Sequence, residues 1–266
     1  MRKIDVFFCL LLAVFSCQEK KNTPFLQEEE VQLVQPNIIV SNTIIDSVET
    51  ITAELLLDGV VLYYTDNGEA PSRDSNKYEK PIQVVKPGVF KFKSFHPVLK
   101  SSAVSSIKIY KKGLTPKKIT WHSKEPEKYK GVGDLTLINN KKASLEFSNM
   151  EWQGFETIAS ATVFFKELTT IKSIKIGYLC DTASWIFPPE SVSVLVFFKD
   201  GTSKEIVKKT NILEKQSSRT MESIQIPIEM DVVSLKIKVS NVSSIPDWHE
   251  GRGLKAWLFM DEWIFN

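Results

Sequence analysis

The sequence has little cysteine, little histidine and almost no net charge. Of its 266 residues, three are cysteine and three are histidine. Three cysteines cannot build the framework of a disulfide-rich secreted domain, and the histidines form no cluster suited to catalytic zinc. Lys and Arg together number 34 against 32 Asp and Glu, so the basic excess typical of nucleic-acid-binding proteins is missing. We therefore expect no nucleic acid partner.

A hydrophobic run long enough to span a bilayer is also missing. The main apolar run, Val6–Phe15, follows the basic residues Arg2 and Lys3. It is too short for a transmembrane helix, which needs about 20 apolar residues, but it suits a signal peptide. We expect residues 1–16 to be a signal peptide.

The run Val14–Cys17 resembles a bacterial lipobox. That resemblance implies diacylation of Cys17 and a lipidated tether over 17–35, so that the lipid anchor is the only contact with the membrane. Gln18 stands where lipoproteins of the inner membrane commonly have Asp, which favours a cell-envelope location at the outer membrane, on either face. The alternative is a plain secretory signal with an incidental cysteine.

No catalytic signature is present. There is no P-loop, no G-x-G-x-x-G and no G-x-S-x-G motif, and Gly131 and Gly133 precede no helical pattern. We expect a protein that is not an enzyme. Cys180 ends a strand pattern and is more typical of a buried structural cysteine than of a reactive thiol.

The apolar pattern has the period of β-strands throughout. Phe90–Phe95 and Leu235–Val239 alternate between apolar and polar residues, and Asp58 with Gly59 is a hairpin-type dipeptide. We predict an all-β protein: a small immunoglobulin-like sandwich over 36–112, followed by a jelly-roll sandwich over 113–266.

Residues Tyr63–Pro71 and Tyr78–Ile82 carry a first resemblance to a family. The two runs resemble the small C-terminal module of chitobiases and β-hexosaminidases over about residues 36–110. Gly68 would supply the positive φ of the turn, although Asn67 departs from the usual motif. The resemblance implies an immunoglobulin-like support without chemistry of its own.

A second resemblance covers residues 113–266. Met150–Phe155, Ser184–Pro189 and Ile245–Gly251, in this order, resemble the discoidin-like module, also described as coagulation factor type C or family 32 carbohydrate-binding module. Such galactose-binding-like modules follow the catalytic barrel of some family 20 β-hexosaminidases, but no barrel is present in this sequence.

The candidate binding residues are loop tryptophans with polar neighbours. A flat indole can pack on the C–H face of a sugar ring while polar side chains bind its hydroxyls. The predicted ligand-binding residues are Trp152, Gln153, Trp185, Asp247, Trp248, His249 and Arg252, and the resemblance supports Trp152, Trp185, Trp248 and His249 most directly. The alternative is that each tryptophan packs its loop against the sandwich, as we expect for Trp257 and Trp263 in the closing strand.

The second resemblance also implies a structural Ca²⁺ ion held by oxygen ligands near the chain ends. The matching positions are Asn139, where the family usually has Asp, and Glu262. The alternative is a glycine-rich turn held by hydrogen bonds alone.

These observations favour a non-catalytic, lipid-anchored carbohydrate-binding protein that holds glycans at the cell envelope for partner glycoside hydrolases. The resemblance to modules of β-hexosaminidases suggests that the bound glycan contains N-acetylhexosamine or galactose. A structural or protein–protein adhesion module that uses the same loops remains open, as does a divergent hydrolase with a site between the two modules.

Overall fold

The computed structural model describes residues 31–124, 128–210 and 218–266 of the chain. Within these ranges, the regular structure consists of β-strands and two short 3-10 helices, η2 (Thr136–Ile138) and η3 (Thr182–Ser184). The prediction of an all-β protein is therefore confirmed.

The predictions for the N-terminus concern residues that are mostly not described. The signal segment 1–16, Cys17 and most of the tether 17–35 lie outside the described residues. In the part of the chain that the structure does describe, no helix is both long enough and apolar enough to span a bilayer.

Residues 36–112, here called the first unit, fold as a small sandwich. Its strands are β1 (Asn37–Ile39), β2 (Ile44–Ile45), β3 (Glu49–Glu54), β4 (Val61–Thr65), β5 (Asn76–Lys77), β6 (Ile82–Val84), β7 (Gly88–Phe95) and β8 (Ser105–Lys111). One sheet has the order β1-β3-β6 and the other β2-β8-β7-β4-β5. Ile51, Phe92 and Ile109 are among the residues of their shared core. This is the immunoglobulin-like layout that the sequence predicts.

Alternation along β7 shows how the sequence builds this core. Phe90 and Phe92 are buried, whereas Lys91 and Lys93 are partly exposed. Successive strand residues point to opposite faces, so this run decides which face packs inward. After β4, Gly68 has a φ of 82°, the left-handed conformation that the sequence predicts for this turn.

Residues 113–266, here called the second unit, form a larger sandwich. Its strands are β9 (Lys118–Trp121), β10 (Gln153–Phe155), β11 (Ile158–Cys180), β12 (Ser191–Phe197), β13 (Ser203–Lys209), β14 (Thr220–Ser240) and β15 (Leu258–Phe265). The strand order is β10-β15-β11-β14-β12-β13, and β9 pairs with β11.

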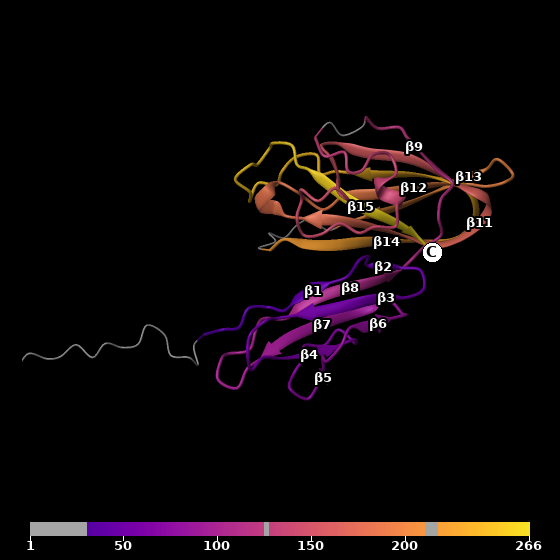
Figure 1. The fold of residues 1–266 in the computed structure, drawn as a ribbon. Coiled ribbons are helices and arrows are strands. Elements are labelled where there is room, and N and C mark those ends of the chain that lie inside the picture. The colour runs from indigo at the N-terminus through magenta and orange to yellow at the C-terminus, as the bar shows by residue number, and fades with distance from the viewer. Residues whose placement is uncertain (1–30, 125–127, 211–217) are drawn as a thin grey trace, which may run out of the picture.

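Two long strands connect the layers of the second unit. β11 and β14 pair along most of their length, with register shifts between Phe164 and Thr169 and between Ile171 and Ser173. The first half of β11 also pairs with β9, and its second half with β15. Bulges of this kind bend a strand, and Figure 1 shows β11 curving around one end of the unit. The bent hairpin thus contributes to both layers.

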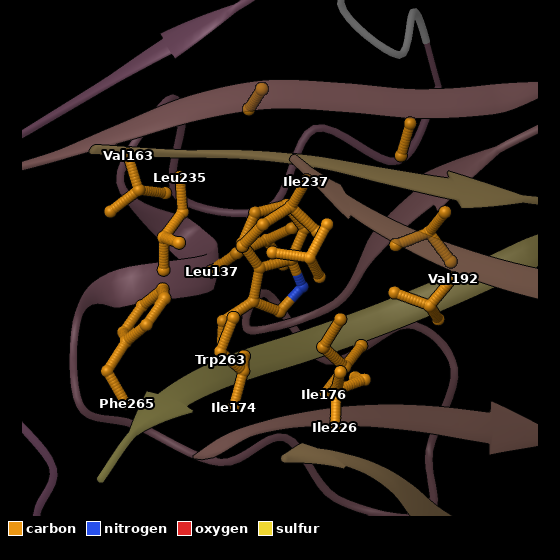
Figure 2. Packing of buried hydrophobic residues seen from close by; sticks show 14 of the residues in the cluster. Leu137, Val163, Ile174, Ile176, Val192, Ile226, Leu235, Ile237, Trp263 and Phe265 are labelled. Carbon is orange, nitrogen blue, oxygen red and sulfur yellow. The ribbon is translucent and has the colours of Figure 1, made fainter. Parts of the chain in front are cut away.

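The core of the second unit surrounds a tryptophan. The Trp263 indole is 1% exposed, and Figure 2 shows it at the centre of the drawn side chains, with Leu137 and Ile237 labelled beside it. Val192 and Val194 of β12 are fully buried in the same cluster. Trp263 therefore lies in the core, as its position in the closing strand predicts.

The two units meet where the chain passes from β8 to β9. At this link Leu114 N–H, just inside the second unit, donates to Phe265 O at 2.7 Å. Between the units, Asn42 Nδ2 donates to Asn140 O at 3.0 Å. A Cβ atom at Gly113 would overlap the Phe265 backbone, so a glycine is needed for this close approach. The C-terminal strand β15 therefore ends beside the link between the units (Figure 1).

Candidate functional site

Two loops of the second unit meet at the end that faces away from the C-terminus (Figure 1). They are the 181–190 loop, after β11, and the 241–257 loop, after β14. Trp257 N–H donates to Trp185 O at 2.8 Å, and Phe187 N–H donates to Trp257 O at 2.9 Å. These bonds join the loops into one surface. Five of the predicted ligand-binding residues lie on it: Trp185, Asp247, Trp248, His249 and Arg252.

Trp185 has an unusual backbone conformation. Its φ of 62° lies in the left-handed region, which costs a non-glycine residue about 1–2 kcal/mol. Hydrogen bonds of the turn offset this cost. Trp185 N–H donates to Thr182 O at 2.9 Å, and Asp181 and Ile186 exchange two backbone hydrogen bonds. Strained positions held in this way are frequent at functional sites. Here the strain places a half-buried indole at the loop surface.

His249 fastens the two loops together. Gly251 N–H donates to Nδ1 at 3.0 Å, so the ring proton must be on Nε2, which lies 2.9 Å from Thr182 O and donates to it. Both ring nitrogens are therefore bonded to backbone. This corrects the expectation that His249 binds sugar hydroxyls. Its imidazole holds the two loops in position, and neither ring nitrogen is free to bond a ligand.

Trp248 is the most accessible tryptophan on this surface, with 37% of its residue area exposed. Its indole lies 5.6 Å from the His249 ring and 6.0 Å from the Phe187 ring, between centroids. The Trp185 ring packs edge-on against the same imidazole, with 6.4 Å between the ring centroids. Trp185 and Trp248 therefore flank one histidine, which places both indoles in one cluster.

Charged residues border the indoles. Asp247 and Arg252 are exposed, and within the described ranges neither side chain has a hydrogen bond or an ion pair. Leu254, also exposed at 53%, lies two residues beyond Arg252. The surface thus combines flat apolar rings with unpaired polar groups, the combination expected of a site that binds a partly polar ligand.

Trp152 and Gln153 are not part of this surface. The Trp152 indole is 1% exposed, packs against Phe259, and donates from Nε1 to Ser144 O at 2.9 Å. Gln153 is 2% exposed, and its Nε2 donates to Lys130 O at 3.3 Å. This corrects the expectation that both bind ligand. Gln153 begins β10, which pairs with β15, and Trp152 directly precedes this strand, so both residues lie in the interior.

The structure adds Tyr129 and Phe147, which the sequence did not single out, and it corrects the expected place of Trp257. Trp257, expected in the core, is half-buried and packs edge-on against Tyr129 at 5.1 Å, and Tyr129 in turn contacts Phe147 at 6.4 Å. Tyr129 and Phe147 line a hollow of about 430 Å³ together with Met150. Tyr129 and Phe147 each stand alone among polar residues. The one local sign that Tyr129 lies in a loop is Gly131, two residues after it.

Asn139 and Glu262, the expected calcium ligands, already have protein partners. Asn139 Nδ2 donates to Glu151 Oε2 at 2.6 Å, and Asn139 Oδ1 accepts the Lys141 N–H at 2.9 Å. Glu262 Oε2 accepts the Asn140 N–H at 2.9 Å, and burial raises the pKa of Glu262 to about 8. In the described ranges, no three His, Cys, Asp or Glu side chains are arranged to hold a metal ion. These residues do not fit a calcium site, which needs several free oxygen ligands.

The first unit matches a known family. Residues 42–106 match the family model of the chitobiase/beta-hexosaminidase C-terminal domain. This confirms the resemblance that was based on Tyr63–Pro71. The matching family is that of a C-terminal domain and not of a catalytic one. A comparison with curated protein sequences gives no match.

Several solved structures, two of them carbohydrate-binding modules, are similar to the chain. CpGH89CBM32-4, produced by Clostridium perfringens, is 10% identical, with 57% of this chain and 97% of that chain covered and a TM-score of 0.38. GH31 CBM32-2, solved bound to GalNAc, is 12% identical, with 56% and 96% covered and a TM-score of 0.37. A SusE-like protein is 12% identical, with 86% and 95% covered and a TM-score of 0.36. Identities and TM-scores this low indicate only a distant structural similarity, and they assign no ligand to this chain.

Proposed function

We propose that the protein is a non-catalytic glycan-binding protein, and that the surface of the 181–190 and 241–257 loops is its binding site. The observation that carries the proposal is the pair of indoles, Trp185 and Trp248, flanking His249. Aromatic faces of this kind pack on the C–H face of a sugar, and the exposed side chains of Asp247 and Arg252 would bond its hydroxyls.

The placement of His249 supports a binding role over a catalytic one. A general base needs a free nitrogen within reach of the substrate, and both nitrogens of His249 are bonded to backbone. The first unit supports the same proposal, because it matches a C-terminal domain of glycan-degrading enzymes. A screen with chromogenic glycosides should accordingly give no turnover.

The cellular role is inferred from the N-terminal sequence. We propose that acylated Cys17 holds the protein at the cell envelope, at the outer membrane, where it retains glycans with N-acetylhexosamine or galactose for partner glycoside hydrolases. Cys17→Ala should release the protein from the membrane fraction, because two acyl chains anchor far more firmly than a tether alone. Cys9→Ala is the matched control and should stay bound. A Cys17→Ala protein that resists a high-salt wash would contradict the anchor.

A glycan array tests the binding site. Trp248→Ala should weaken glycan binding about tenfold or more, the equivalent of roughly 1.4 kcal/mol, since the indole supplies the exposed aromatic face. Leu56→Ala is the matched control: it removes another exposed apolar side chain, 96% exposed, from the first unit, and should leave binding unchanged. Absence of any glycan ligand, together with binding to a purified envelope protein, would replace the proposal with an adhesion role.

A further inference from the structure

Two consecutive carboxyl groups, those of Asp261 and Glu262, are buried in β15. Their residues are 0% and 3% exposed. The register between β11 and β15 shifts at this point, so the two residues lie opposite Gly177 alone. A bulge of this kind re-aims the side chains that it contains, and both carboxyl groups contact the 139–143 loop.

The loop binds the two carboxyl groups through two N–H groups and one ammonium group. Asn140 N–H donates to Glu262 Oε2 at 2.9 Å, and Ala143 N–H donates to Asp261 Oδ2 at 3.2 Å. Lys142 Nζ forms an ion pair with Asp261 Oδ1. The Lys142 side chain is 6% exposed, so a full positive charge is buried beside the two acids.

The surroundings are shaped to hold this ammonium group. A Cβ atom at Gly177 would overlap both Asp261 Oδ1 and Lys142 Nζ, so only glycine leaves room for the pair. On the first unit, the ring of Tyr110 has its centroid 5.4 Å from Lys142 Nζ, a distance at which an aromatic face stabilises a cation.

We propose that the Lys142 ammonium group is a built-in cation, which ties the 139–143 loop to β15 in the way that a structural calcium ion ties loops in discoidin-like modules. The second unit then folds without a metal ion. A buried carboxylate that loses its cation is strongly destabilising, so Lys142 is essential to this arrangement. The inference is independent of glycan binding.

Thermal unfolding of the purified protein tests the proposal. The wild-type melting temperature should be the same in excess EDTA and in excess CaCl2, because a ligand shifts the transition only when it binds the folded state. Lys142→Met keeps an unbranched side chain one atom shorter and removes the charge, and it should lower the melting temperature by about 10 °C. Lys175→Met is the matched control, since Lys175 Nζ lies 5.8 Å from the centroid of the same Tyr110 ring and, in the described ranges, pairs with no carboxylate. It should melt within about 2 °C of wild type.

A double variant keeps the test decisive if Lys142→Met does not fold. Lys142→Met combined with Asp261→Asn removes both charges of the ion pair and should recover most of the lost melting temperature. A double variant no more stable than Lys142→Met would overturn the proposal. So would a Lys142→Met protein that melts like wild type, or a wild-type protein whose melting temperature falls in EDTA.

Discussion

The Trp152 turn and the Trp248 turn are alike in sequence and differ in the structure. Each tryptophan follows an acidic residue and precedes a polar one, with glycine shortly after. Each turn is closed by a backbone bond, from Trp152 N–H to Asn149 O at 3.1 Å and from His249 N–H to Pro246 O at 3.0 Å. Yet Trp152 is 1% exposed and Trp248 is 37% exposed.

The difference arises from the chain segment that comes after each turn. Trp152 leads directly into β10, which pairs with β15 and brings the indole against Phe259. Trp248 leads into more loop, up to residue 257, before β15 begins. A strand that joins the sheet therefore buries the preceding aromatic ring, whereas a loop leaves it accessible. Local turn chemistry alone does not decide whether a tryptophan belongs to the core or to a site.

The largest expected effect comes from Trp152→Ala. Removing a fully buried indole should lower the free energy of unfolding by about 3–5 kcal/mol, measured by urea denaturation. Trp248→Ala, the matched control, should lower it by less than about 1 kcal/mol, because its indole is partly in solvent. If the two variants lost the same free energy of unfolding, the conclusion that one indole is core and the other is not would be wrong.

A smaller effect is expected from His249→Ala. The change removes the two hydrogen bonds of the imidazole, to Gly251 N–H and to Thr182 O, and each lost bond costs about 1 kcal/mol. The free energy of unfolding should therefore fall by about 2 kcal/mol. Glycan binding should weaken as well, because Trp185 and Trp248 lose the ring that positions them. Glu250→Ala, at the exposed neighbouring residue, should change neither quantity. Weaker binding with unchanged stability would instead place the imidazole in contact with ligand.

The smallest effect concerns the thiol of Cys180. Burial, with a smaller contribution from Glu222, raises the pKa of Cys180 to about 12, so at pH 8 only about one thiol in ten thousand is ionised. Iodoacetamide should therefore label the folded protein, prepared from residue 18 onward, very slowly. Trp248→Ala should leave this rate unchanged, while Trp152→Ala should raise it through local opening. Rapid labelling of the wild type would show a reactive thiol.

The fold was largely predictable because strand alternation is a local property. Val192, Val194 and Val196 alternate with partly exposed residues, and all three lie in the core. The length of β11 was not predictable, since the run around Lys166 and Glu167 breaks the apolar pattern although the strand continues through it. Bulges allow such continuations, and their sequence signal is weak.

The sequence predicted which loops carry the candidate site better than it predicted the role of each residue. Trp185 and Trp248 were identified correctly as loop residues, since proline, serine or glycine stand near each of them. The role of His249 depends on Thr182, which is 67 residues away, and no local pattern encodes such a contact. The burial of Trp152 depends in the same way on pairing between distant strands.

The course of β15 has a mechanical consequence. The strand begins beside Trp257 in the binding loops and ends at Phe265, whose carbonyl accepts the Leu114 N–H at the link to the first unit. A pull between a captured ligand and the first unit would therefore load β15 along its own axis. The antiparallel bonds to β10 and β11 lie across that axis, so they would bear the force together in shear rather than open one after another.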